Sequence, residues 1–105
     1  MTDGRERRRS ARHVLTEPAE VHLGAVTVMA RVEDVSKHGM GLTLPEGTKV
    51  EHGMTVWIIT GKVASYAITG TIVRIAERGR VGVAFHEILA GDSLEAIESM
   101  PLTEK

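Results

Sequence analysis

Arginine is concentrated near the N-terminus of the chain, in the segment GRERRRSARH. Five of the thirteen Lys and Arg residues lie there: Arg5, Arg7, Arg8, Arg9 and Arg12. Within RRSAR, Arg8 and Arg12 are separated by three residues. A guanidinium group is a planar fork of N–H donors that fits phosphate oxygens, and its plane can stack on a base. The segment therefore predicts a binding site for an anionic partner.

The rest of the chain has the opposite charge balance. After residue 12 there are eight basic and twelve acidic residues, and the net charge of the whole chain is −1. Five clustered arginines could hold nucleic acid through its phosphates. An acidic body without interleaved basic and aromatic residues is a poor nucleic-acid surface, however. Nucleic acid is therefore the less favoured anionic partner.

A second unusual stretch is EDVSKHGMG, which follows a predicted strand. It has the spacing Asp34-x-Ser36-x-x-Gly39. Asp and Ser form local hydrogen bonds with the backbone and favour turns, and glycine allows another group to approach closely. Taken alone, this stretch predicts a turn.

Alternating apolar residues predict strands along most of the chain. In VTVMARVE, residues 26–33, valine or alanine recurs at every second position, from Val26 to Val32. A turn or bulge near Gly24 joins this strand to the preceding AEVHL as a hairpin. The other predicted strands are GMGLTL, TVWIIT, VASYAI, TGTIVRIAE and RVGVAF. Gly61 and Lys62 predict a tight hairpin between TVWIIT and VASYAI, and Gly70 predicts a bulge. Short strands separated by turns indicate a closed or nearly closed antiparallel barrel.

The C-terminal segment GDSLEAIESM has helical periodicity instead. Its apolar residues at helical spacing are Leu94, Ile97 and Met100. Asp92 or Ser93 is expected to cap the start of this helix, and Pro101 marks its end. We expect the helix to cover the barrel.

The composition predicts an aliphatic core, because hydrophobic residues make up 42% of the chain and aromatic residues only 3%. Trp57 and Tyr66 are expected in the core or in hairpin contacts. There is no cysteine, and therefore no disulfide framework or thiolate metal site. No apolar run approaches the roughly 20 residues that span a bilayer, and no secretory signal is recognisable. We expect a soluble cytoplasmic protein that does not bind membranes.

No catalytic or metal site is expected. The five histidines are dispersed, without an HxxxH or HxH pair beside a carboxylate: His13, His22, His38, His52 and His86. No Ser, His and Asp have the spacing of a catalytic triad, and GMG lacks the lysine and helix of a phosphate loop. The sequence therefore predicts a protein that is not an enzyme.

Together, RRSAR, DVSKHG and RVGVAF resemble the PilZ domain, a family of small β-barrels that bind the bacterial second messenger cyclic di-GMP. The family signature combines an RxxxR motif in an N-terminal loop with a [D/N]xSxxG motif on the barrel. Arg8 and Arg12 match the first motif, and the second is matched by Asp34, Ser36 and Gly39. The resemblance covers nearly the whole chain.

The resemblance implies an all-β fold, namely a six-stranded antiparallel barrel with a C-terminal helix and a flexible N-terminal arm. It divides the chain into three parts. Residues 1–18 are expected to form the arm with the RxxxR motif, residues 19–100 the barrel with its helix, and residues 101–105 a tail.

The resemblance also implies which residues bind the ligand: Arg7, Arg8, Arg9, Arg12, Asp34, Ser36 and Gly39. The arginines would bind phosphate or the O6/N7 edge of guanine, with Arg7 and Arg9 assisting through the phosphates. Asp34 would accept guanine N–H donors, and the Ser36 hydroxyl would bond to the ligand or to its own turn. Gly39 would keep a side chain out of the ligand's way.

Two details of the motifs need comment. Arg5 and Arg9 form a second RxxxR, but the pair ending at Arg12 lies closer to the first predicted strand and is preferred. His38 stands where the family often has a small residue, and we expect it to be solvated. No metal accompanies the ligand.

The sequence thus predicts a single-domain cyclic di-GMP receptor. Ligand binding would order the N-terminal arm, and a downstream effector protein would recognise the changed surface. The alternatives are a PilZ-like adaptor that does not bind the nucleotide and a barrel that binds nucleic acid. A monomer is favoured, because no heptad or large helical face offers a dimer seam. One ligand molecule or an intercalated pair is compatible with the family.

Overall fold

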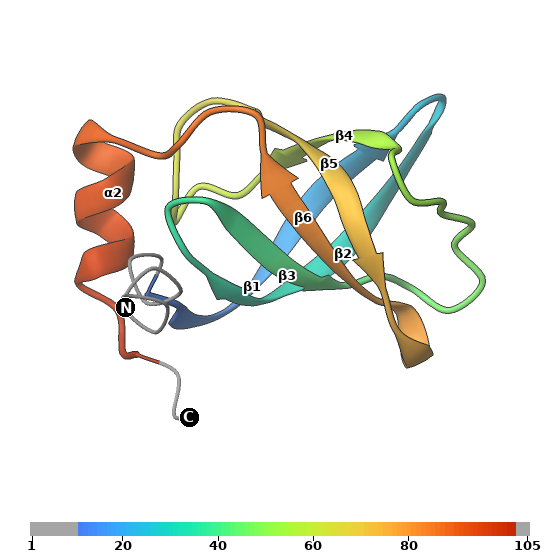
Figure 1. Ribbon diagram of the computed structural model, residues 1–105, viewed down its shortest axis with the longest axis horizontal. Coiled ribbons are helices and arrows are strands. Elements are labelled where there is room, and N and C mark those ends of the chain that lie inside the picture. Colours follow the sequence, from blue (N-terminus) through green and yellow to red (C-terminus); the bar gives the residue numbers. More distant parts are fainter. Residues whose placement is uncertain (1–10, 103–105) are drawn as a thin grey trace, which may run out of the picture.

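Six antiparallel strands close into a barrel, and one helix stands at one end of it (Figure 1). The computed structural model describes residues 11–102. Its elements are β1 (His13–Leu23), β2 (Val26–Val35), β3 (Gly39–Thr43), β4 (Thr55–Ile59), β5 (Ile68–Ile75), the short 3-10 turn η1 (Glu77–Gly79), β6 (Arg80–Phe85) and α2 (Gly91–Glu98). The order around the barrel is β1-β2-β3-β6-β5-β4, so β6 lies between β3 and β5. The barrel and helix expected from the sequence are confirmed.

Aliphatic side chains fill the barrel. The largest fully buried ones are Met40, Leu42, Ile58, Ile72 and Ile97. The first four lie on strands, where alternate residues face opposite sides, and Ile97 comes from α2. Of the two positions expected for Trp57 and Tyr66, the core is wrong, because their side chains are 43% and 54% exposed. Trp57 lies between two inward-facing residues of β4 and therefore faces outward.

The first strand begins earlier than the sequence suggests. β1 starts at His13, inside the range of residues 1–18 expected for the arm. Pro18 is tolerated within this strand, because β1 pairs with β2 along this stretch but with β4 only from Glu20 onward. The barrel therefore includes residue 13, and Arg12 immediately precedes it.

A β-bulge in β2 determines which way Asp34 faces. The pairing of β2 with β3 shifts by one residue between Val32 and Asp34, which makes Glu33 an extra residue. Val32 and Val35 are fully buried, whereas Glu33 and Asp34 are partly exposed. Without the extra residue, Asp34 would follow Val32 by one strand period and would face the core. The bulge turns both carboxylates outward.

The connection between β4 and β5 is a loop and not a tight hairpin at Gly61 and Lys62. It spans residues 60–67, so VASYAI forms a strand only in its last residue, Ile68. Val63 and Ala64 are nevertheless buried within this loop. Their burial accounts for the apolar character of the segment, which resembles a strand in the sequence.

The bulge expected at Gly70 lies instead at Val73, where the pairing of β5 with β6 shifts by one residue. Gly70 has a different role. A Cβ atom on Gly70 would lie 2.5 Å from Cγ1 of Val83 on β6. The glycine therefore permits close approach of the two strands.

Helix α2 does not use the expected cap. Its N-cap residue is Ala90, and no side chain caps the first turn. Ser93 is buried instead, with its hydroxyl 3.3 Å from the hydroxyl of Tyr66 in the 60–67 loop. Ser93 thus links the helix to the loop at the same end of the barrel.

The segment after α2 returns to the start of β1. The backbone N–H of Val14 donates to the carbonyl of Pro101 at 2.7 Å. The Nδ1–H of buried His13 donates to the carbonyl of Met100 at 3.0 Å. The C-terminal segment is therefore hydrogen-bonded directly beside Arg12.

Candidate functional site

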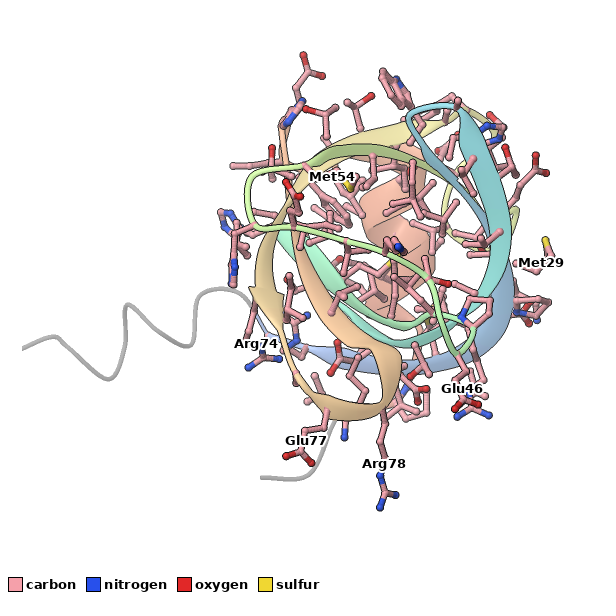
Figure 2. The ribbon with its side chains drawn as sticks, turned by 90° about the vertical axis from the view of Figure 1, so that its right-hand side faces the viewer. Met29, Glu46, Met54, Arg74, Glu77 and Arg78 are labelled. Atoms are coloured by element: carbon pink, nitrogen blue, oxygen red, sulfur yellow. The ribbon has the colours of Figure 1, made fainter. Side chains whose placement is uncertain are left out.

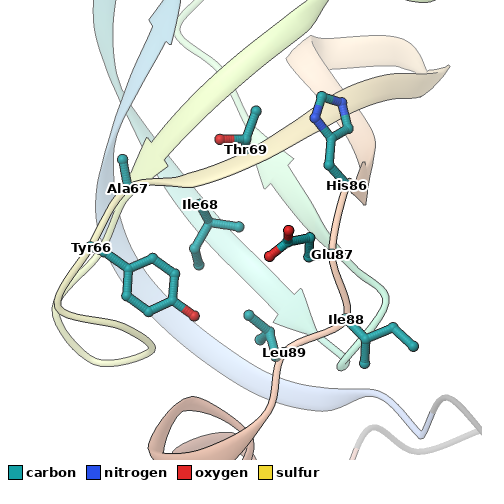
Figure 3. A pocket seen from close by; sticks show the side chains of 8 residues that line it. All are labelled: Tyr66, Ala67, Ile68, Thr69, His86, Glu87, Ile88 and Leu89. Carbon is teal, nitrogen blue, oxygen red and sulfur yellow. The ribbon is translucent and has the colours of Figure 1, made fainter.

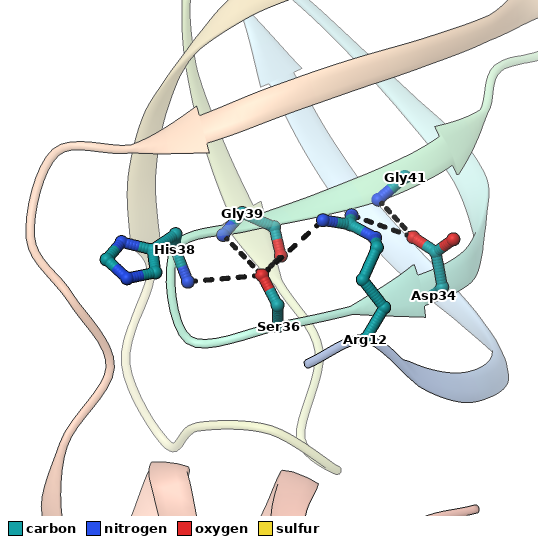
Figure 4. A network of polar contacts seen from close by, with 6 residues as sticks. All are labelled: Arg12, Asp34, Ser36, His38, Gly39 and Gly41. Atoms are coloured by element: carbon teal, nitrogen blue, oxygen red, sulfur yellow. Dashed lines mark hydrogen bonds and ion pairs between the residues drawn. The ribbon is translucent and has the colours of Figure 1, made fainter. Parts of the chain in front are cut away.

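The β2–β3 turn is built around the Ser36 side chain (Figure 4). The Ser36 hydroxyl oxygen accepts hydrogen bonds from the backbone N–H groups of His38 and Gly39, both at 3.2 Å. The Ser36 N–H donates to the carbonyl of Gly39 at 2.8 Å. Ser36 is fully buried. The Ser36 hydroxyl therefore bonds within its own turn, which is one of the roles expected from the sequence.

The two sequence motifs meet at Arg12, as Figure 4 shows. Its Nη2 donates to Oδ1 of Asp34 at 2.9 Å, and its Nη1 donates more weakly to Oγ of Ser36 at 3.4 Å. Arg12 comes just before β1, and Asp34 faces it because of the bulge in β2. The second motif thus holds an arginine of the first in a fixed direction.

Asp34 also binds the backbone of the neighbouring strand. Its Oδ1 accepts the N–H of Gly41 at 3.1 Å. A Cβ atom on Gly41 would lie only 2.8 Å from that oxygen. Gly41 is therefore part of the site, although sequence analysis did not select it. The signal was present in GMG, where the second glycine lies outside the motif.

Gly39 has a packing role in the barrel, and its expected role of clearing space for a ligand stays a prediction. A Cβ atom there would collide with the carbonyl oxygen of Val83 on β6. Gly39 is buried and pairs with Ala84. The glycine allows β3 to start close against β6, directly after the turn.

Two hollows flank the Arg12–Asp34 pair. The first has a volume of about 500 Å³ and includes Arg12, His38 and Arg74 in its lining. The second, of about 340 Å³, includes Asp34 and shares Arg74 with the first. Both fall in the size range of small-molecule sites. The motif residues therefore lie along a surface that has room for a ligand.

His38 is less solvated than expected. It lines the larger hollow, but its Nε2 is buried and has no hydrogen-bond partner within residues 11–102. Its backbone N–H is held by Ser36. The structure thus corrects the expectation of a solvated ring.

Glu33, the bulged residue beside Asp34, is held in its charged form. The hydroxyl of Thr43 donates to its carboxylate at 2.7 Å, and Nε of Arg31 donates to the same oxygen at 3.0 Å. These contacts, with Thr43 the largest cause, lower the pKa of Glu33 despite its partial burial. The bulge therefore presents two carboxylates, each with its own arginine.

We expect Thr43→Val to destabilise the protein more at neutral pH than in acid. Folding lowers the pKa of Glu33, mainly through the hydrogen bond from Thr43. The stabilisation of the folded protein by the charged Glu33 side chain is therefore complete above the pKa of Glu33 in the unfolded chain, and it is lost as the pH falls through the pKa in the folded protein. The variant should lose about 1 kcal/mol of unfolding free energy at neutral pH and progressively less between about pH 5 and pH 3. Urea unfolding across this range measures the difference. An equal loss at every pH would contradict it.

A third hollow, of about 360 Å³, lies between the start of β5 and the segment before α2 (Figure 3). Its polar side chains include Glu87 and His86, and Tyr66 stands at one side. No lysine or arginine lines it. A carboxylate without a cationic neighbour does not suit an anionic ligand, so this hollow is the weaker candidate for the site predicted by the arginines.

The remaining predicted site residues lie outside the described part of the chain: Arg7, Arg8 and Arg9. Within residues 11–102, no group of three or more His, Cys, Asp or Glu side chains is placed to hold a metal ion. In the same part of the chain, no helix is both long and apolar enough to cross a membrane.

Comparisons with known proteins agree with this architecture. The family model described as PilZ domain matches residues 6–100. The fold is similar to a solved structure, the PilZ domain with c-di-GMP of YcgR from Escherichia coli, with a TM-score of 0.62 and 17% sequence identity. That match covers 88% of this chain and 86% of the other. No curated protein matches the sequence. At this identity the structural likeness establishes the fold.

Proposed function

The chain belongs to the PilZ domain family, and on this premise we propose that it is a receptor for cyclic di-GMP that has no enzymatic activity. One observation carries the proposal: Asp34 and Ser36 hold the guanidinium of Arg12 beside a hollow of about 500 Å³. The solved PilZ domain of YcgR, which has the same fold, contains c-di-GMP. An oriented arginine beside an open surface suits a ligand with two phosphates and two guanines.

In this proposal Arg12 provides the fixed contact. Holding its side chain before the ligand arrives reduces the conformational entropy lost on binding. The side chain keeps 40% of its surface exposed, and a guanidinium group is suited to a phosphate or to the O6/N7 edge of guanine. Asp34 and Ser36 act mainly through Arg12, because Ser36 is buried and Oδ1 of Asp34 already accepts two hydrogen bonds.

The arginines before Arg12 complete the proposed site. Arg8 would bind the same ligand, with Arg7 and Arg9 assisting through the phosphates. Because the ligand neutralises several like charges at once, binding would order the arm against the barrel. His13 and Val14 hydrogen-bond to the segment after α2, so an ordered arm and the C-terminal segment would form one surface. A downstream effector protein would recognise that surface.

Isothermal titration calorimetry with cyclic di-GMP tests the proposal. We expect saturable binding by the wild-type protein, and Arg12→Ala should weaken it by about ten- to one-hundredfold, since a hydrogen bond to a charged group contributes about 1.5–3 kcal/mol. GTP and linear diguanylate are ligand controls. Lys49→Ala removes the same charge from the loop between β3 and β4 and should bind normally.

Two other results would lead to different conclusions. Wild-type protein that does not bind at tens of micromolar, a concentration sufficient for about micromolar affinity, would favour the adaptor that does not use the nucleotide. Equal losses in Arg12→Ala and Lys49→Ala would indicate attraction by net charge alone. In both cases circular dichroism must show that the barrel is intact.

A further inference from the structure

Beside the Arg12–Asp34 pair, the middle of the outer surface of β3 and β6 carries almost no side chains, because it lies between the turn and the outward pair of Thr43 and Arg80. Gly41 pairs directly with Gly82, and the next outward residue on β6 is Ala84. We call these three residues the glycine shelf. Neighbouring strands are about 4.8 Å apart and alternate residues along a strand about 6.6 Å apart. A flat area of this kind is comparable in size to a purine ring system.

Arg74 forms the wall of the shelf opposite Asp34. The cross-strand pairs run from Asp34 to Gly41, from Gly41 to Gly82, and from Gly82 to Arg74. The Arg74 side chain leans over the glycine, since a Cβ atom on Gly82 would lie 3.4 Å from its Cβ and 3.6 Å from its Nε. Arg74 lines both hollows that flank the Arg12–Asp34 pair.

The bulge in β5 accounts for the direction of Arg74. The pairing with β6 shifts between Ile72 and Arg74, so Val73 is the extra residue. Ile72 is buried, whereas Val73 and Arg74 are both exposed. Figure 2 shows Arg74 pointing away from the barrel. The bulge thus presents an apolar side chain and a cation together at the edge of the shelf.

Within the described residues 11–102, no hydrogen bond or ion pair is found for Arg74 or for Arg80, whereas the other two arginines near the carboxylates are paired. Arg12 pairs with Asp34, and Arg31 pairs with Glu33. Arg80 contributes to the charge attraction that lowers the pKa of Glu33. Of Arg74 and Arg80, only Arg74 lines both hollows beside the Arg12–Asp34 pair, so its planar donor fork is the one placed to meet a ligand there.

We propose that Arg74 recognises a guanine base of the ligand through its O6/N7 edge, with the base lying on the glycine shelf. This inference rests on the proposed function. A base is favoured over a phosphate, because the glycine shelf and Val73 offer a flat and partly apolar surface beside Arg74. Arginine donates bidentately to guanine O6 and N7, and adenine lacks the O6 acceptor.

The test combines a protein variant with a ligand variant. Calorimetry compares cyclic di-GMP with its 7-deazaguanine analogue, in which a C–H replaces the N7 acceptor, on wild-type protein and on Arg74→Ala. We expect Arg74→Ala to weaken binding of cyclic di-GMP by roughly tenfold. We also expect the penalty for the 7-deaza analogue to shrink severalfold in this variant, because the contact it probes is already absent.

Three further variants test the roles of charge, of the shelf surface and of the planar donor fork. Arg80→Ala removes the same charge from β6 and should leave the 7-deaza penalty unchanged. Gly82→Ala places a methyl group on the shelf, where it meets only the flexible Arg74 side chain. The barrel should therefore unfold at the same urea concentration as the wild type, whereas nucleotide binding should weaken. Arg74→Lys should not restore the 7-deaza penalty, since an ammonium group lacks the fork.

The outcomes separate this inference from the proposed function. If the wild-type protein binds cyclic di-GMP but the 7-deaza penalty is the same in Arg74→Ala, guanine recognition by Arg74 is overturned and the receptor remains. If Arg74→Ala weakens both ligands by one factor, Arg74 binds a phosphate and the inference is also overturned. If the wild-type protein does not bind cyclic di-GMP, the receptor and the inference both fall.

Discussion

Replacing Gly39 by alanine should destabilise the barrel by about 3 kcal/mol or more. The added Cβ atom would collide with the carbonyl oxygen of Val83, which belongs to the backbone of β6 and cannot turn aside as a flexible side chain could. Relief would require β3 to move away from β6, and the turn held by Ser36 would move with it. Urea unfolding followed by circular dichroism measures the loss.

Gly61→Ala is the matched control for this prediction. No atom lies within 4 Å of a Cβ placed on Gly61, and its backbone φ is not positive. This variant should stay within about 0.5 kcal/mol of the wild type. A Gly39→Ala protein with wild-type stability and weakened nucleotide binding would contradict the packing role. It would restore the view that Gly39 only clears space for the ligand.

The two glycines of GMG illustrate what the sequence can and cannot reveal. The motif spacing identifies Gly39 as important, but its physical role depends on the β6 backbone, which is more than forty residues away in the sequence. Gly41 lies outside the motif, and its contact with Asp34 depends on the register of β2 against β3. Residue type and spacing are local properties, whereas register is decided by the whole barrel.

The fold was predictable to the extent that it depends on local patterns. Alternation in residues 26–33 predicts β2, and the helical spacing of Leu94 and Ile97 predicts α2. The bulges at Glu33 and Val73 were not predicted, because they appear only when each strand is aligned with its partner. These two bulges turn Asp34 and Arg74 outward. The least predictable features of the strands are thus the ones that present the charged groups of the site.

The 60–67 loop was misassigned for a similar reason. Val63 and Ala64 are apolar because they are buried at the end of the barrel, not because they alternate along a strand. In a short sequence window, apolar residues that are buried in a loop cannot be distinguished from apolar residues that are buried on a strand. Only the position of α2 and of the neighbouring Tyr66–Ser93 contact distinguishes the two.

Asp34→Ala should weaken binding of cyclic di-GMP by about ten- to one-hundredfold, although the proposed site leaves the ligand contacts to the arginines. Removing the carboxylate takes away the 2.9 Å hydrogen bond that orients Arg12. It also leaves the N–H of Gly41 without this acceptor. The expected loss is that of a hydrogen bond between charged groups, and calorimetry measures it. Because the Arg12 and Asp34 side chains are partly exposed, the free energy of unfolding should fall by only about 1 kcal/mol.

A double-mutant cycle distinguishes positioning from direct contact. If Asp34 acts through Arg12, then Asp34→Ala should have little further effect on affinity once Arg12 is alanine, because the group that it positions is absent. If the Asp34 carboxylate itself accepts guanine N–H donors, the two losses should add. Ser36→Ala provides an independent comparison, since its weaker 3.4 Å contact with Arg12 predicts a smaller coupling than that of Asp34.

Asp34→Asn separates the charge of this residue from its shape. The amide oxygen can still accept the N–H groups of Gly41 and Arg12, but the charge that strengthens the second bond is lost. Affinity should therefore fall between those of the wild type and Asp34→Ala, and the unfolding free energy should stay close to the wild-type value. An Asn variant as weak as the Ala variant would show that the negative charge, and not the geometry of the acceptor, orients Arg12 for the ligand.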